Sequence, residues 1–299
     1  MRPSHWLKNA FVFAALVFAG KLSDPRAVGL TVLAFAAFCL LSSMAYIVND
    51  LADAEDDRRH PVKRERPIAA GLVARGEALW LAGACFVAGA VLCLSAGWPN
   101  FALLAVGLAY VGLSFLYTYW AKHYVLIDVL CIASGFVLRS VAGGAAIWVP
   151  VSRWLLACTF TLCMFLGFAK RRCELAASED RQGALAPKAG PPGYGPVLLE
   201  YFLGVSAALA IVTFLLYTVD VASPPLFFSV PLVVFCIFRV WMLVEAGKVQ
   251  GPTEAVTRDV PFIVAFVLWA VYAGIAVTWG GQLQEAAQGL LHWLQPGGG

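Results

Sequence analysis

Residues 28–71 decide the fold class, and they read VGLTVLAFAAFCLLSSMAYIVNDLADAEDDRRHPVKRERPIAAG. The first part, 28–48, is an uncharged and mostly apolar run, long enough to cross the roughly 30 Å hydrocarbon core of a bilayer as a helix. The second part, 49–71, is crowded with charged side chains of both signs. The stretch therefore predicts a transmembrane helix that leaves the membrane directly into a segment able to carry chemistry.

Eight further apolar runs accompany this one along the chain. The nine runs are 9–22, 28–48, 76–96, 99–119, 124–147, 152–170, 196–219, 224–245 and 260–280. Composition agrees, because 61% of the 299 residues are hydrophobic and only 13% are charged, whereas a soluble domain carries about 25% charged residues. We therefore predict an all-α polytopic membrane protein with nine transmembrane helices in a single domain, 1–299.

The positive charges are concentrated on one side of the predicted membrane. With a cytoplasmic N-terminus, the cytoplasmic segments hold 16 of the 21 lysines and arginines, the other side holds three, and Arg139 and Arg239 lie inside helices. Such an asymmetry is what the positive-inside rule requires. It places the loops 49–75 and 171–195 in the cytoplasm, and the tail 281–299 opposite as an interfacial helix or flexible tail. Binding residues gather on loops, and these two loops lie in the predicted cytoplasm. We therefore expect a protein of the inner (plasma) membrane whose active site faces the cytoplasm.

The strongest chemical signal is a stripe of oxygen ligands. Asn49, Asp53 and Asp57 recur every four residues, and residues four apart stack on one helix face. Mg²⁺ prefers a few carboxylates together with substrate phosphate oxygens, so we predict that these three bind Mg²⁺ and form the catalytic centre. We also expect that the protein itself supplies no counter-ion to the stripe. The alternative is a loop that only anchors the topology. Such a loop needs cations, but it has no need for a carboxylate stripe beside them. Three carboxylates lie off the stripe, as expected solvated neighbours: Asp50, Glu55 and Asp56.

Charged side chains elsewhere form a predicted substrate-binding set. Most are cations at the cytoplasmic ends of predicted helices, where they would pair with phosphate. Asp128 and Arg139 lie inside the fifth run, and ionisable groups at membrane depth usually face a cavity or the bundle interior. Arg139 has the alternative of neutralisation by other buried groups, and Lys170 that of a simple pair with Glu174 four residues on. Arg239 is a weaker candidate. The set comprises Lys8, Lys63, Arg66, Lys122, Asp128, Arg139, Lys170 and Arg171.

Five stretches of the chain resemble one family. They are RPSHWLKN (2–9), NDLADAEDDRRHPVKRERPIAAG (49–71), LIDVLCIASGFVLRSVAGGAA (126–146), AKRRCEL (169–175) and GPTEAVTRD (251–259). The chain is similar through them to the UbiA superfamily of intramembrane prenyltransferases, and within it to the decaprenyl-phosphate phosphoribosyltransferases of mycobacterial cell-wall arabinan synthesis. The resemblance spans nearly the whole chain. It implies nine helices in a horseshoe around a central cavity that opens to the cytoplasm and to lipid.

The resemblance also implies an activity, a Mg²⁺-dependent glycosyltransferase of cell-wall biosynthesis. Such an enzyme moves the 5-phosphoribosyl group from phosphoribosyl diphosphate to a polyprenyl phosphate lipid and releases diphosphate. The acceptor is already an anion, so the reaction needs no general base. The expected partners are these two substrates and the membrane, with no nucleic acid, and the sequence leaves open whether the protein is a homo-oligomer.

Two other functions stay open at this point. A prenyl diphosphate transferase acting on an aromatic acceptor would use the same carboxylate stripe. Aromatic-acceptor members of the superfamily carry a second aspartate-rich motif, however, where this chain has only Asp128 followed by Arg139. A transporter or lipid flippase would be expected to have inverted repeats and broken helices near the midplane, and the sequence shows neither clearly.

Overall fold

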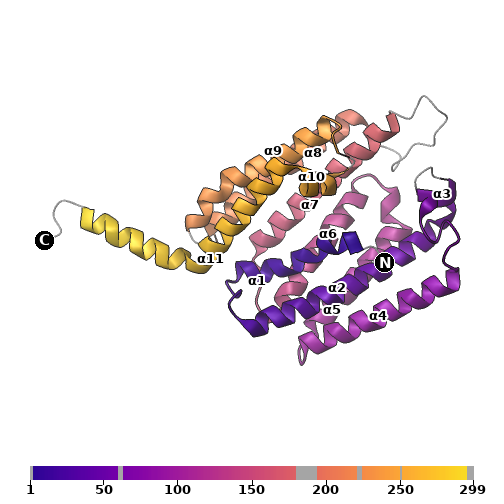
Figure 1. Ribbon diagram of the computed structural model, residues 1–299, viewed down its shortest axis with the longest axis horizontal. Coiled ribbons are helices and arrows are strands. Elements are labelled where there is room, and N and C mark those ends of the chain that lie inside the picture. The colour runs from indigo at the N-terminus through magenta and orange to yellow at the C-terminus, as the bar shows by residue number, and fades with distance from the viewer. Residues whose placement is uncertain (1–2, 60–62, 180–193, 221–223, 250, 295–299) are drawn as a thin grey trace. The chain divides into compact units, whose positions relative to one another are not determined.

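The computed structural model describes residues 3–59, 63–179, 194–220, 224–249 and 251–294 (Figure 1). Within these ranges every regular element is a helix, which confirms the all-α prediction. The chain divides into two compact units, Met1–Val151 and Ser152–Gly299. Each unit is a helical bundle with its own buried side chains.

The first unit is built around one long helix, α2 (Pro25–Ala52), which packs against α4, α5, α6 and the N-terminal 3-10 helix η1. Phe38 and Leu41 of α2 are almost completely buried at its centre. Gly143 of α6 lets η1 approach closely, because a Cβ there would lie 1.9 Å from the Val12 carbonyl oxygen. The remaining elements of this unit are η1 (Pro3–Phe13), α1 (Ala14–Phe18), α3 (Ala54–Arg59), η2 (Lys63–Glu65), α4 (Arg75–Gly97), α5 (Ala102–Tyr119), η3 (Ala121–His123) and α6 (Ile127–Ile147).

In its described part, the second unit contains five α-helices and one 3-10 helix. These are α7 (Arg153–Glu179), α8 (Pro196–Asp220), η4 (Pro224–Ser229), α9 (Val230–Glu245), α10 (Pro252–Arg258) and α11 (Val260–Leu294). The helices α7 and α8 lie against each other along their length, with the ring centroids of Phe168 and Phe202 5.1 Å apart. The helix α9 packs against α11. This unit therefore has a hairpin, α7–α8, and a second pair of long helices.

The predicted membrane spans agree with the helices. In the described part of the chain, eight helices are long and apolar enough to cross a membrane. The first predicted span, 9–22, corresponds to a shorter apolar helix, Trp6–Phe18, so the count of nine is approximate. The protein is a multi-pass membrane protein, and the horseshoe with its central cavity stays a prediction.

Two predicted boundaries differ from the structure. The cytoplasmic loop 171–195 begins as helix, because α7 continues to Glu179, and 180–193 lies outside the described residues. The tail 281–299 is not a separate short helix, since residues up to Leu294 extend α11, and 295–299 again lies outside. Both differences arise because a helix does not have to end where its apolar run ends.

Candidate functional site

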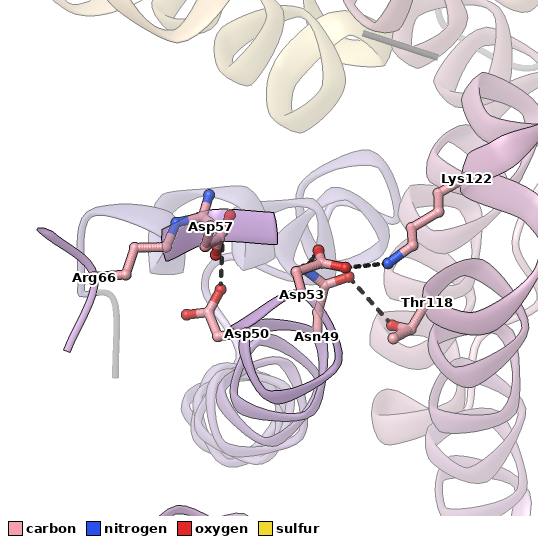
Figure 2. Close-up of polar contacts among 7 residues, drawn as sticks. All are labelled: Asn49, Asp50, Asp53, Asp57, Arg66, Thr118 and Lys122. Carbon is pink, nitrogen blue, oxygen red and sulfur yellow. Dashed lines mark hydrogen bonds and ion pairs between the residues drawn. The ribbon is translucent and has the colours of Figure 1, made fainter. Parts of the chain in front are cut away.

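The carboxylate stripe lies where α2 ends. Ala52 is the last residue of α2, and Asp53 follows it at φ −91° and ψ 3° before α3 begins. The backbone N–H of Asp53 donates to the Asn49 carbonyl at 2.9 Å, and that of Asp57 donates to the Asp53 carbonyl at 2.8 Å. Asn49, Asp53 and Asp57 therefore stand on successive turns, as their spacing predicts. Their side chains nevertheless pair with different groups (Figure 2).

The Asp53 carboxylate belongs to a cluster that joins three elements. Asn49 donates its amide N–H to Asp53 Oδ2 at 3.0 Å, and the Lys122 ammonium, from η3, pairs with Asp53 Oδ1. Thr118, near the end of α5, donates its hydroxyl to Asn49 Oδ1 at 3.4 Å. Figure 2 shows the four side chains converging. We call Asn49, Asp53, Thr118 and Lys122 the Asp53 cluster.

The Asp57 carboxylate is held by a different cation. Arg66 Nη1 donates to Asp57 Oδ2 at 2.6 Å and to Asp50 Oδ1 at 3.3 Å, so one guanidinium bridges two carboxylates. Asp57 is buried, at 3% exposed. Arg58 reinforces the arrangement by donating Nε–H to the Ala69 carbonyl at 3.2 Å. The segment after η2 is thereby folded back onto α3, and we call Asp50, Asp57 and Arg66 the Arg66 clamp.

Two expectations drawn from the sequence are wrong here. The stripe does have internal counter-ions, Lys122 for Asp53 and Arg66 for Asp57. Asp50 is not a solvated neighbour, because its side chain is only 14% exposed and pairs with Arg66. Helical periodicity reveals neighbours along one helix, whereas Lys122 is 69 residues away in the chain. The other two off-stripe carboxylates, Glu55 and Asp56, are exposed as expected.

The chemistry of the Asp53 cluster fits a magnesium ion. Asn49 supplies an amide oxygen and Asp53 a carboxylate, which are ligand types that Mg²⁺ accepts, and Asp53 already holds a cation in Lys122. Among the described residues, no three His, Cys, Asp or Glu side chains form a group that could hold a metal ion. The third predicted ligand, Asp57, belongs to the Arg66 clamp and is paired with Arg66. Metal binding by Asn49, Asp53 and Asp57 stays a prediction.

Arg139 is the centre of a buried network in the first unit. Its Nε donates to Asn9 Oδ1 at 2.7 Å and its Nη2 to the Tyr110 hydroxyl at 2.9 Å. Its Nη1 donates to the Gly135 carbonyl at 2.8 Å, and its guanidinium carbon lies 4.6 Å from the Tyr110 ring centroid. These contacts tie η1, α5 and α6 together through groups that are all uncharged. They favour a structural role for Arg139, while substrate binding stays a prediction.

The remaining candidates of the first unit lie in different settings. Asp128 is completely buried in the first turn of α6. Lys8 is half-buried on η1, next to the buried Asn9, and Lys63 is exposed on η2. The sequence already marks Asn9 as part of a polar entry to the first predicted span, but Thr118 was not selected, although it is a polar residue near the end of the apolar run 99–119. A polar side chain within such a run is the signal that could have found it.

In the second unit, Lys170 and Arg171 both meet Glu174. The Lys170 ammonium lies 3.6 Å from Glu174 Oε1, which confirms the alternative of an i,i+4 pair. Arg171 Nη1 lies 2.6 Å from Glu174 Oε2, and its side chain is only 10% exposed. Arg172 pairs at 3.2 Å with Glu245 and so links α7 to α9. The cytoplasmic end predicted for α7 therefore carries a fixed arginine and a more exposed lysine.

Arg239, the weaker candidate, has a structural partner. Its Nε and Nη2 donate to the two Asp259 oxygens at 3.0 and 2.9 Å, a bidentate pair between α9 and the start of α11. Asp259 Oδ1 also accepts the Phe262 N–H at 2.9 Å. The Arg239 hydrogen bonds hold the pKa of the Asp259 carboxyl below its ordinary value, because they favour its charged form.

Comparison with known proteins adds to this geometry. The model of the family described as "UbiA prenyltransferase family" matches residues 9–266. Decaprenyl-phosphate phosphoribosyltransferase of Mycolicibacterium smegmatis is 33% identical over 295 residues, which cover 93% of this chain and 91% of that protein. The enzyme of the same name from Mycobacterium tuberculosis is 31% identical, with 94% and 93% covered. The structure of a UbiA homologue from Archaeoglobus fulgidus bound to GPP and Mg²⁺ matches with a TM-score of 0.69 at 19% identity, covering 93% of this chain and 97% of that one.

Proposed function

The chain belongs to the UbiA prenyltransferase family, and we propose that it transfers the 5-phosphoribosyl group from phosphoribosyl diphosphate to a membrane polyprenyl phosphate, releasing diphosphate. Membership makes it a membrane enzyme and a transferase. The choice of donor and acceptor rests on one observation. Relatives named decaprenyl-phosphate phosphoribosyltransferase share 31–33% identity along more than nine-tenths of the chain.

The reaction exchanges one bond at ribose C1 for another. The bond from C1 to the diphosphate oxygen breaks with its electron pair on diphosphate, and a lipid phosphate oxygen forms the new bond to C1. Positive charge develops on the ribose ring and negative charge on the leaving diphosphate. Because the lipid phosphate is already an anion, the protein has no proton to remove. Its task is to bind and orient anions, which is electrostatic catalysis by positioned groups.

The Asp53 cluster and Asp57 are the groups that we assign to the diphosphate. Asn49, Asp53 and Asp57 would hold Mg²⁺, whose charge offsets that of the departing diphosphate. Lys122 stands at the same carboxylate and can donate charge-assisted hydrogen bonds to phosphate oxygens. Thr118 holds the Asn49 side chain, and Arg66 fixes Asp57. Each assignment is a proposal supported by the contacts of these residues.

A second anion distinguishes phosphoribosyl diphosphate from a prenyl diphosphate, because its ribose carries a 5-phosphate. Leaving that phosphate unpaired in a partly dry site would be costly. We assign it to Lys170 and Arg171, which lie on a different helix from the carboxylate stripe. Arg171 is held in place by Glu174 at 2.6 Å, and an ordered guanidinium suits phosphate. The remaining candidates for the ribose and the lipid phosphate are Lys8, Lys63, Asp128 and Arg139.

The proposal also includes a location. Of the 21 lysines and arginines, 16 lie on one side of the predicted membrane. Because positively charged loops stay in the cytoplasm, this asymmetry supports an active site that faces the cytoplasm from the inner membrane. Phosphoribosyl diphosphate is a soluble, highly charged donor and would reach the enzyme from that side. The product, a lipid-linked phosphoribose, fits a role in cell-wall biosynthesis. A homo-oligomer stays an open prediction.

One assay tests the proposed function. Purified protein in lipid is incubated with labelled phosphoribosyl diphosphate, Mg²⁺ and polyprenyl phosphates of several lengths, and the label is followed into the lipid phase. We expect Mg²⁺-dependent transfer that a chelator stops and that Asp53→Ala or Asp57→Ala abolishes while the protein stays monodisperse. If the protein instead ignores this donor and couples a prenyl diphosphate to a phenolic acid, the aromatic-acceptor alternative replaces the proposal.

A further inference from the structure

The Asp53 carboxylate is occupied on both oxygens by groups of the protein itself. Oδ1 pairs with the Lys122 ammonium and Oδ2 accepts the Asn49 amide at 3.0 Å (Figure 2). Asn49 Oδ1 in turn accepts the Thr118 hydroxyl at 3.4 Å. A metal ion approaching Asp53 would therefore meet a carboxylate that already has a positive partner.

Lys122 is suited to be an exchangeable partner. Its side chain is 17% exposed and that of Asp53 is 26% exposed, so both remain within reach of solvent. An ammonium on a flexible four-carbon stem is a compact point charge that can be redirected. Arg66 is a contrasting case, because it bridges two carboxylates, of which Asp57 has a side chain only 5% exposed. Lys122 can thus move away from its carboxylate at a lower cost than Arg66 can.

We propose that Lys122 is a placeholder cation. Its ammonium pairs with Asp53 until a metal ion and a diphosphate bind together, and it then leaves Asp53 and donates to a diphosphate oxygen instead. The placeholder makes metal binding at Asp53 depend on the diphosphate. This inference rests on the proposed function, because that function brings a metal-bound diphosphate to the Asp53 cluster. No covalent bond changes in the exchange, and only ionic and hydrogen-bond partners are redistributed.

Charge balance explains why the two ligands must bind together. Asp53 and Lys122 neutralise each other. A divalent ion bound alone would displace Lys122 and leave an ammonium beside the ion, where like charges in a partly buried site repel strongly. A diphosphate removes this repulsion, because its oxygens accept from the displaced ammonium and bind the metal at the same time. Each ligand therefore raises the affinity for the other by the same factor, as linkage requires.

The test measures metal binding in the absence of turnover. Mn²⁺ serves as the probe, and its free concentration is followed by electron paramagnetic resonance with purified protein, with and without inorganic pyrophosphate. Binding of Mn²⁺ to pyrophosphate alone is measured in parallel and subtracted. For the wild-type protein we expect pyrophosphate to raise the apparent Mn²⁺ affinity by about ten- to a hundredfold, the range of one charge-assisted hydrogen bond.

Three variants sharpen the experiment. Lys122→Gln should bind Mn²⁺ without pyrophosphate more tightly than the wild type does. Pyrophosphate should still raise the affinity of this variant, because it binds the metal directly, but by a factor about tenfold smaller than in the wild type, because no ammonium has to be displaced. Lys122→Arg keeps the cation and should keep the dependence on pyrophosphate, which covers the case that the glutamine variant does not fold. Arg64→Gln is the matched control, since it removes an exposed cation of η2, and it should behave like the wild type.

Two results would overturn the placeholder. One is an equal effect of pyrophosphate on the wild type and on Lys122→Gln, and the other is tight Mn²⁺ binding by the wild type without any pyrophosphate. Failure of the proposed function is seen separately, as absence of transfer from phosphoribosyl diphosphate. A protein that fails in transfer but keeps the Lys122-dependent coupling supports the placeholder and points to a different diphosphate donor.

Discussion

Replacing Arg66 by alanine should destabilise the protein more than any other single change in the charged segment after α2. Arg66 Nη1 lies 2.6 Å from Asp57 and 3.3 Å from Asp50. The Asp57 side chain is only 5% exposed, so removing the guanidinium takes the cation away from a poorly hydrated carboxylate that lies close to Asp50. The loss of the ion pair is therefore increased by repulsion between Asp50 and Asp57, which Arg66 bridges in the unsubstituted protein.

The size of the effect follows from burial. Removing one partner of a buried ion pair costs about 3–5 kcal/mol. Arg66 itself is 25% exposed, so water partly replaces it and the lower end, about 3 kcal/mol, applies. On the usual scaling, this corresponds to a fall of about 6–12 °C in the midpoint of thermal unfolding. Thermal unfolding of purified protein in detergent, followed by intrinsic tryptophan fluorescence, measures it.

A matched control and a double variant separate this mechanism from a general loss of charge. Arg64→Ala removes an exposed arginine from the same turn and should shift the midpoint by no more than about 1 °C, as surface substitutions usually do. Adding Asp57→Asn to Arg66→Ala should recover part of the loss, because the buried side chain at position 57 is then neutral. An Arg66→Ala midpoint equal to that of Arg64→Ala would refute the clamp.

Three further predictions concern orientation, donor binding and pH. In a protein freed of its eight cysteines, Arg64→Cys should react with a membrane-impermeant maleimide only from the cytoplasm and Asn100→Cys only from the opposite side, and the reverse pattern would overturn the orientation. Lys170→Ala or Arg171→Ala should raise the KM for phosphoribosyl diphosphate by about one to two decades, with little change in the lipid KM in steady-state assays, and equal increases in both KM values would contradict the 5-phosphate assignment. Because its arginine partner lowers the pKa of Asp259 in the folded state from 3.8, the carboxylate contributes stability above that ordinary value and loses it as pH falls through the lowered one. Unfolding midpoints measured from pH 5 downwards should therefore fall more steeply for the wild type than for Asp259→Asn, and parallel curves would exclude the pair as the cause.

The fold could be predicted from the sequence to a large extent because lipid imposes simple rules. A run such as 28–48 has to be helical to satisfy its backbone in hydrocarbon, and the structure contains it within α2, Pro25–Ala52. The rules say less about where a helix ends in water. That is why α7 extends past the membrane run to Glu179, and why the tail continues α11 to Leu294.

The candidate site could be predicted only in part, and the division has a physical cause. Four-residue spacing correctly placed Asn49, Asp53 and Asp57 on successive turns, because helical geometry is local. The partners of these residues were not predictable by the same rule, since Lys122 comes from another element 69 residues away. One local clue was present in the sequence. Thr118 and Lys122 are also four residues apart, and both belong to the Asp53 cluster, Thr118 through Asn49 and Lys122 through Asp53.

The internal counter-ions change what the carboxylate stripe means for folding. Carboxylates crowded at the end of a membrane helix would repel one another if only a metal ion could neutralise them, and folding would then depend on metal. Here Lys122 neutralises Asp53, and Arg66 is shared by Asp50 and Asp57. The charges are thus largely balanced before any ligand binds, so the site can form first and bind metal later. Asp53→Asn should consequently cost metal binding and transfer while leaving the unfolding midpoint nearly unchanged, because Asp53 and Lys122 are both partly exposed and such pairs contribute only about 0–1 kcal/mol. A large fall in the midpoint of this variant would show that folding itself relies on the Lys122 pair, and would remove the reason for treating that pair as exchangeable.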